Sequence, residues 1–239
     1  MHTVLSPCAE IEMIPPLIIM EAQSKGINLI AITDHNASGN IEAVQKAAQG
    51  TNITVLPGME LQTKEEVHVL CLFDTIDQVQ SFQEYVNKHL PSIKNRPDFF
   101  GEQLVVDQSG DFIRKEERLL LTSASISINE AYEKVHEIGG ILIPAHINRK
   151  VNGLIEILGF VPEDVQVLAL EISRHISVEN AKEKFPQIRN FKLIQNGDVH
   201  RLSEFLGSTI FEIEKPTIFE ISLALKFEDG RSYLVELME

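Results

Sequence analysis

The sequence predicts an α/β fold built around a parallel sheet. Short apolar runs alternate with helical stretches along most of the 239 residues, the runs are apolar throughout, and polar residues follow most of them. Strands that are apolar throughout are typical of parallel sheets covered on both faces. No linker or low-complexity tract interrupts this order, so we expect a single domain over residues 1–239.

The first third of the chain predicts alternating helices and strands. Residues 16–25 have helical character, and Gly26 is typical of the position after a helix C-terminus. Ser38 or Asn40 is a candidate N-cap for the next helix. The expected elements are a helix at 16–25, a strand at 27–32, a helix from 38 or 40 to 49, strands at 53–56 and 67–73, and a helix at 76–89.

Residues 95–121 interrupt this alternation and predict an inserted hairpin. Two short runs, 103–107 and 112–114, flank Ser109-Gly110, and glycine-containing pairs of this kind are typical of hairpin turns. We therefore expect a hairpin at the edge of the fold within about residues 95–121.

The alternating order resumes after residue 121. Gly139-Gly140 ends a helical run, and Gly230 separates the last two predicted elements. The expected elements are a helix at 128–138, strands at 141–143, 167–172 and 191–195, a helix at 217–226, and a final strand at 232–237.

Composition argues against several classes of function. No apolar run approaches the length of a membrane span, and the first residues lack a signal-peptide pattern. The two cysteines, Cys8 and Cys71, are too few for a disulfide framework, so we expect a cytoplasmic protein. The formal net charge is 21 − 35 = −14, which argues against long nucleic acid as a partner because non-specific binding needs a basic face. A small phosphorylated substrate or nucleotide remains compatible, since bound divalent ions reverse the local sign of charge.

Histidines and acids are concentrated at the ends of the predicted strands. The carboxyl ends of parallel strands meet at one rim, where α/β folds place their active sites. Imidazole and carboxylate together suit zinc, manganese or iron. A single histidine at such a place is more often an ordinary polar residue, but their coincidence favours a metal cluster. The residues that share this placement are His2, His35, Glu60, His68, His146, Asp198 and His200.

Five segments resemble, in order, the motifs of the PHP family (polymerase and histidinol phosphatase). The opening His2-Thr3 resembles the family's His-x-His-Thr motif. The other four are Thr33-Asp34-His35-Asn36, Pro57-Gly58-Met59-Glu60 followed by Val67-His68, Pro144-Ala145-His146, and Gly197-Asp198-Val199-His200. The resemblance runs through the chain as far as His200 and implies a single PHP-type domain over residues 1–239.

This resemblance implies a fold and a ligand set. The fold would be a distorted (β/α) TIM-like barrel with about seven strands, and two or three divalent ions (Zn, Mn or Fe) would lie at the C-terminal ends of the strands. Asp198, His200 and Arg149 are the expected catalytic residues, with Arg149 contacting the phosphate. Asp34 and Glu171 are expected to orient histidine ligands by accepting their second N–H. The expected metal ligands are His2, Cys8, His35, Glu60, His68, His146, Asp198 and His200.

The sequence departs from the family motifs at two places. The family has a further histidine two residues before His2, and we expect Met1 to be the middle residue of that His-x-His motif, with the true start upstream. Pro7 replaces an acidic ligand, and Cys8 follows where some members have histidine. Thiolate binds zinc well, although a small structural cysteine is the alternative.

The sequence therefore predicts a metal-dependent phosphoesterase, acting on a mono- or diester through a hydroxide that bridges two ions. Two alternatives stay open. The same hydroxide could cleave a C–N or ester bond, as in amidohydrolases, or the chain could be a catalytically impaired metal-binding domain.

Overall fold

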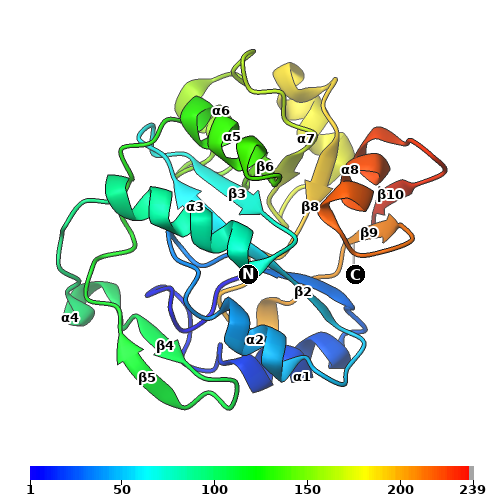
Figure 1. Ribbon diagram of the computed structural model, residues 1–239. Coiled ribbons are helices and arrows are strands. Elements are labelled where there is room, and N and C mark those ends of the chain that lie inside the picture. The colour runs from blue at the N-terminus through cyan, green and yellow to red at the C-terminus, as the bar shows by residue number, and fades with distance from the viewer. Residues whose placement is uncertain (237–239) are drawn as a thin grey trace.

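The computed structural model, which describes residues 1–236, has a mixed α/β architecture (Figure 1). Its main sheet has the strand order β1-β2-β3-β6. The strands are β1 (Leu29–Ile32), β2 (Thr54–Gln62), β3 (His68–Leu72) and β6 (Ile141–Pro144). β1 and β2 are parallel, whereas β3 is antiparallel to both β2 and β6. The expectation of a wholly parallel sheet is therefore wrong for β3.

The direction of β3 follows from its connection to β2. Only residues 63–67 separate the two strands, and the Thr63 N–H donates to the Val67 carbonyl at 2.9 Å. A parallel crossover needs a dozen or more residues, so this short link returns the chain as a hairpin. The first residue of β3 consequently lies at the same rim as the last residues of β2, and Gln62 faces His68 in the register.

β2 is longer than expected because its first half pairs with β1 and its second half pairs with β3. Its parallel ladder with β1 ends at Pro57, and its antiparallel ladder with β3 begins at Gly58. A Cβ at Gly58 would lie 2.9 Å from side-chain atoms of Leu72 and Thr33, so only glycine fits this close approach. Glu60 therefore lies within β2 rather than after it.

Three two-stranded sheets complete the strands. β7 (Leu170–Ile172) and β8 (Leu193–Gln195) are parallel, whereas β4 (Leu104–Val106) with β5 (Phe112–Lys115) and β9 (Thr209–Glu212) with β10 (Ser232–Val235) are antiparallel. The predicted last strand includes Leu237, which is outside the described residues. β9 was not predicted. Within residues 1–236, the sheets of four and two strands do not join into a closed barrel.

Helices cover the outer face of the main sheet. α3 and α5 each begin with a capping box, Thr75 with Gln78 and Ser127 with Glu130. The short helices α4, α6 and α7 were not predicted. The helices are α1 (Pro15–Ser24), α2 (Ile41–Ala47), α3 (Ile76–His89), α4 (Pro97–Phe100), α5 (Ile128–Glu137), α6 (Leu154–Leu158), α7 (Val178–Lys184) and α8 (Ile218–Lys226), with 3-10 turns at Pro186–Ile188 and Leu202–Glu204.

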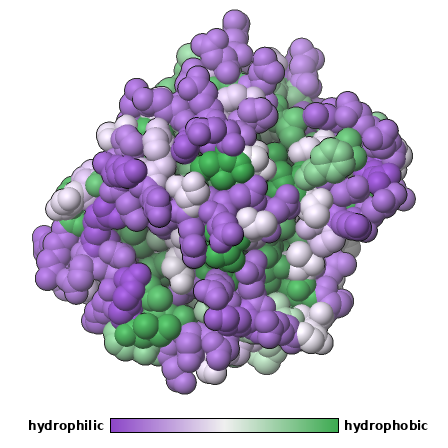
Figure 2. Space-filling model, in the orientation of Figure 1, coloured by the Kyte–Doolittle hydropathy of each residue, from purple (hydrophilic) through white to green (hydrophobic). Residues whose placement is uncertain are grey.

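The core has two parts. The larger part packs α1, α2, α3 and α5 against the strands. The smaller part gathers apolar side chains from β2, β3, β6, β8 and the residue preceding β7 around three residues of α8, so these strands curve around one helix (Leu56, Leu72, Ile143, Ala169, Ile194, Ile218, Ile221, Leu225). The face in Figure 2 is mainly hydrophilic, with a hydrophobic patch at the lower left where Figure 1 places the β4–β5 hairpin. In the described part of the chain, no helix is long and apolar enough to cross a membrane.

Candidate metal centre

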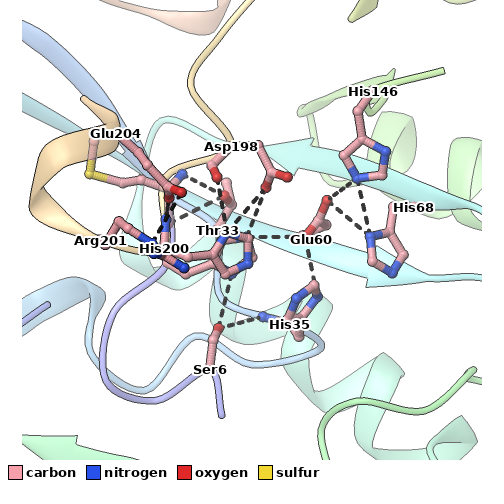
Figure 3. Close-up of polar contacts among 12 residues, drawn as sticks. Ser6, Thr33, His35, Glu60, His68, His146, Asp198, His200, Arg201 and Glu204 are labelled. Carbon is pink, nitrogen blue, oxygen red and sulfur yellow. Dashed lines mark hydrogen bonds and ion pairs between the residues drawn. The ribbon is translucent and has the colours of Figure 1, made fainter. Parts of the chain in front are cut away.

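Seven of the eight predicted metal ligands converge on one pocket, where five of them are buried and Asp198 and His200 are partly exposed (Figure 3). Glu60 lies at its centre, between His35 on one side and His68 and His146 on the other. The residues that meet here are His2, His35, Glu60, His68, His146, Asp198 and His200. They come from the opening segment, the ends of β1 and β6, the interior of β2, the start of β3 and the segment after β8.

Each carboxylate oxygen of Glu60 faces two imidazole nitrogens. The distances from Glu60 Oε2 to His2 Nε2 and His35 Nδ1 are both 3.2 Å. Glu60 Oε1 lies 3.2 Å from His68 Nδ1 and 3.1 Å from His146 Nε2. The side chain of Glu60 is only 2% exposed, so water does not supply its partners. One carboxylate is thus shared by four histidines.

The polar geometry fits metal ligands better than hydrogen bonds. Glu60 Oε2, His35 Nδ1 and His146 Nδ1 are buried and have no hydrogen-bond partner. Oε2 and the His35 nitrogen are nevertheless 3.2 Å apart. Ligand atoms around a tetrahedral zinc ion are about 3.3 Å from one another, given its bond lengths. Two unpaired lone pairs at that separation are what a shared cation would satisfy.

Within the described residues, three sets of potential ligands have their donor atoms within 4.8 Å of one another. Every set includes His2 or His35, and two of them share Glu60. The sets are His2 with His35 and His200, His35 with Glu60 and His68, and His2 with Glu60 and Asp198. Glu60 is thus the carboxylate that two of the three sets have in common.

The mutual contacts shift the ionisation of the cluster. Burial disfavours the charged form of Glu60, but His68, His35, His146 and His2 lower its pKa well below the ordinary value. Burial also opposes the charging of His2, yet contacts with Asp198 and Glu60 raise its pKa to about 9. Burial and the neighbouring His2 lower the pKa of His35 well below the ordinary value. The pocket therefore holds an ionised carboxylate beside a neutral imidazole, both suited to bind cations.

Asp198 lies between the buried histidines and the partly exposed Arg149. Its Oδ1 lies 3.5 Å from His2 Nε2 and 3.8 Å from His200 Nδ1, while its Oδ2 pairs with Arg149. The Arg149 side chain is 47% exposed, so its guanidinium lies where a substrate could reach it. Asp198 and His146 also have left-handed backbones, with φ values of 47° and 30°. Residues other than glycine rarely adopt such angles, and they are concentrated at functional sites.

The two predicted supporting acids act differently from expectation. Asp34 does not bind a histidine ring; it accepts from the Thr3 N–H and the Ser6 hydroxyl, both at 2.7 Å. Ser6 Oγ lies 3.0 Å from His2 Nδ1, so Asp34 positions His2 through Ser6. Glu171 accepts from the backbone N–H of His146 at 3.0 Å rather than from its ring. Both acids therefore hold the chain segments that carry the ligands.

Asn152 is a supporting residue that the sequence did not reveal. Its carbonyl accepts the His68 backbone N–H at 3.0 Å, and its side-chain amide lies 2.9 Å from His68 Nε2. Its backbone is left-handed, with a φ of 60°. Asn152 lies in an irregular loop. The only sequence signal for it is that asparagine is common in turns, which does not indicate a contact with His68.

Cys8 is the one predicted ligand that lies outside the cluster. Its side chain is exposed, and none of the three ligand sets includes it. Cys71, the second cysteine, is buried within the apolar core.

Comparisons with known proteins place this fold. No family model matches the sequence. An uncharacterized protein of Bacillus subtilis, YqxK, is 22% identical over 91% of this chain and 56% of its own length. The lesion-specific endonuclease Q of Pyrococcus furiosus superposes with a TM-score of 0.75 at 20% identity, over 98% of this chain and 56% of that one. The chain thus spans about half the length of these relatives.

Two further structures bear on the predictions. A two-domain Bacteroides vulgatus protein with a predicted PHP-like metal-dependent phosphoesterase has a TM-score of 0.56 at 13% identity, over 99% of this chain and 63% of that one. Endonuclease Q in complex with a 27-mer duplex has a TM-score of 0.71 at 20% identity, over 97% of this chain and 56% of that one. The chain therefore has the fold of PHP-like metal-dependent phosphoesterases, and the predicted resemblance to the PHP family is confirmed at this level.

The prediction that argued against long nucleic acid as a partner is wrong. The endonuclease Q complex holds a duplex with an abasic lesion at its active site, and that enzyme shares this fold. Net charge is a sum over the whole molecule, whereas a bound strand meets only the face around the site. Divalent ions, when bound there, would reverse the sign that the carboxylates otherwise give that face.

Proposed function

We propose that this chain is a metal-dependent hydrolase of phosphate esters. The observation that carries the proposal is the buried carboxylate of Glu60, shared by four imidazole nitrogens at 3.1–3.2 Å. A hydrogen-bonding role would not leave Glu60 Oε2 and His35 Nδ1 unpaired. The strands around α8, together with β1, support the further proposal that the fold is an incomplete barrel with this cluster at its mouth.

The residues of the cluster would hold two or three divalent ions. Zinc, manganese and iron all suit a set of imidazole and carboxylate ligands. His35, Glu60 and His68 form one ligand set, and His2, Glu60 and Asp198 form another. Such ions, when bound, stabilise negative charge on phosphoryl oxygens and lower the pKa of water.

The side chains at the rim would position the substrate. Arg149 donates to Asp198 and is partly exposed, so it can donate to a phosphoryl oxygen from the same place. His200 Nδ1 lies 2.9 Å from the Asp198 carbonyl, which fixes the ring with Nε2 directed elsewhere. Burial lowers the pKa of His200 and keeps the ring neutral, so Nε2 has a lone pair for a cation or a proton. Asp198 and His200 are thus the proposed catalytic pair, with Arg149 binding phosphate.

For the substrate, we propose a nucleic acid strand. The support is the similarity to endonuclease Q, whose complex contains duplex DNA with an abasic lesion. A phosphodiester also matches the partly exposed Arg149 at the rim, because a backbone phosphate passing the pocket would meet this side chain first.

A substrate panel tests the proposal. We expect the protein loaded with manganese or zinc to cleave a duplex with an abasic site, and to hydrolyse bis(p-nitrophenyl) phosphate faster than p-nitrophenyl phosphate. The variants His35→Ala and Asp198→Ala should lose this activity, whereas the matched control His136→Ala, an exposed histidine of α5, should keep it. Elemental analysis of each variant reports the bound metal. Stoichiometric metal without turnover of any phosphate ester would reject the enzyme and leave a metal-binding domain.

A further inference from the structure

Glu204 contacts the segment that carries Asp198 and His200, although it belongs to none of the three ligand sets found among the described residues (Figure 3). It is the last residue of the 3-10 turn Leu202–Glu204, which begins two residues after His200. Its carboxylate Oε2 accepts the backbone N–H of His200 at 2.8 Å. Its Oε1 lies 3.2 Å from Arg201 Nε, so both oxygens have partners.

The main chain of Glu204 packs against the beginning of the same segment. A Cβ at Gly197 would lie 2.8 Å from the Glu204 carbonyl oxygen, so this close approach requires glycine. The same carbonyl accepts from Arg174 Nη1 at 3.1 Å, which fixes its direction. Glu204 therefore contacts both ends of residues 197–200, one end through its main chain and the other through its carboxylate.

The backbone of residues 197–200 needs support of this kind. Asp198 has a left-handed φ of 47°. A residue with a Cβ keeps this conformation only where its surroundings hold it. His200 Nδ1 lies 2.9 Å from the Asp198 carbonyl, so the ring and this backbone are linked. Without the Glu204 carboxylate, the part-buried N–H of His200 would need another acceptor, and both side chains would be free to move.

We propose that Glu204 is a positioning residue that keeps Asp198 and His200 in place for one ion position of the cluster, while a second position is independent of it. The inference rests on the proposed metal-dependent function and deepens it. Asp198 and His200 belong to two different ligand sets, which share His2. The remaining set contains neither of them and consists of His35, Glu60 and His68.

The two ion positions should respond to different substitutions. Glu204 reaches the cluster through residues 197–200, whereas Asn152 reaches it through the ring of His68. The two supporting residues therefore act on different ligand sets. A residue that merely stabilised the fold would weaken both positions together, so selective loss of one position distinguishes positioning from general stability.

Titration of Glu204→Ala with zinc tests the proposal. The wild-type protein should bind at least two ions. In the variant, one of them should bind about 10–100-fold more weakly, as for the loss of other supporting residues, while another keeps its affinity. Glu204→Gln should bind zinc as the wild type does, because its amide oxygen can still accept the His200 N–H.

Glu10→Ala is the matched control for charge. Glu10 Oε1 lies 3.6 Å from Nη1 of the same Arg201, so this substitution also removes a carboxylate beside that guanidinium. It leaves the bond between Glu204 and the His200 N–H intact. We therefore expect Glu10→Ala to bind zinc with unchanged affinity.

NMR of the His200 ring in the metal-free protein gives a readout that does not depend on ions. The Asp198 carbonyl can only accept, so the wild-type ring should carry its proton on Nδ1. The two tautomers should mix in Glu204→Ala, and Glu204→Gln should restore the wild-type signal. Circular dichroism checks that each variant is folded.

Three results would overturn the proposal. One is wild-type zinc affinity at every position in Glu204→Ala. Another is an unaltered His200 tautomer in that variant. The third is an equal loss of affinity in Glu10→Ala, which would assign the effect to the charge beside Arg201. Absence of zinc binding by the wild-type protein, with a His200 tautomer that still depends on Glu204, would instead reject the proposed function.

Discussion

At the scale of single residues, Glu60 has the strongest claim to function. It is almost fully buried, yet it is held ionised by four histidines rather than by a lysine or arginine. A buried carboxylate normally pairs with a fixed positive charge or a metal. Imidazole binds a cation through the same nitrogen that would otherwise carry a proton, so metal binding at these four rings would compete with protonation.

The substitution Glu60→Gln separates charge from shape. The amide has nearly the same volume but no negative charge, and its NH₂ group would face imidazole nitrogens. We expect metal affinity to fall by at least about 100-fold, more than for the loss of a supporting residue. Isothermal titration with zinc measures this loss, and circular dichroism checks that the fold is retained. Unchanged affinity in a folded Glu60→Gln protein would exclude Glu60 as a metal ligand.

Asn152 tests how the ligands are oriented. The amide nitrogen Nδ2 of Asn152 lies 2.9 Å from His68 Nε2. Amide oxygen and nitrogen exchange places on a half-turn, after which the oxygen would accept the Nε2–H of His68. That contact leaves the lone pair on Nδ1, which faces Glu60 at 3.2 Å. We expect Asn152→Asp to keep metal affinity and Asn152→Gly to lower it about 10–100-fold, although glycine preserves the φ of 60°. Titration with zinc compares the two variants, and NMR of the His68 ring reports its tautomer. An unaltered tautomer in Asn152→Gly would contradict the role.

The sequence predicted the ligands better than their supports. His35, His146 and Asp198 follow apolar runs directly, so the local pattern placed them at a common rim. Asn152 and Ser6 were missed because both lie in irregular segments, where no periodic pattern shows which side chain they meet, and the histidine that Asn152 contacts is 84 residues away. Asp34 was expected to touch a ring but reaches His2 only through Ser6, since the fold of the opening loop decides which atoms it meets.

At the scale of elements, the apolar runs predicted where strands lie but not how they run. β3 is antiparallel because its link to β2 is short, a constraint that residue patterns carry only weakly. The direction matters for the site, since it brings His68 to the rim at the beginning of a strand. β10 was predicted, but its partner β9 was missed because its apolar residues are only partly buried, and Ile210 is 45% exposed.

The link between α8 and β10 should make stability depend on acid pH. Glu220 of α8 accepts from Arg231 Nε at 2.9 Å, and this contact lowers the pKa of Glu220, helped by the Glu214 N–H. Because the pKa of Glu220 is lower in the folded state, its contact with Arg231 stabilises the protein at pH values above the unfolded-state pKa near 4.5. This stabilisation is lost as the pH falls through the folded-state pKa. We expect Glu220→Gln to lower the melting temperature at pH 7, with the difference vanishing in acid. The exposed Glu228→Gln is the control, and a difference independent of pH would contradict the assignment.

At the scale of the whole molecule, the charge of −14 coexists with a site that gathers carboxylates. Glu60 and Asp34 are buried, and Asp198 is largely so, with few basic side chains beside them. Composition was a poor guide to the partner because it averages over all faces, whereas the sign of charge at the pocket depends on what the histidines and acids bind.

Metal binding should therefore stabilise the entire fold. The candidate ligands come from segments between His2 and His200. Bound ions would therefore connect parts of the chain that belong to separate sheets. A ligand at about 100 times its Kd contributes about 2.7 kcal/mol, which corresponds to a rise of about 5–10 °C in melting temperature for a chain of this size. Differential scanning calorimetry with and without zinc or manganese measures the rise, and EDTA should reverse it. Glu60→Gln should lose most of the shift, while Cys8→Ala, outside the cluster, should keep it. An equal shift in Glu60→Gln would mean that the ions bind elsewhere on this acidic surface.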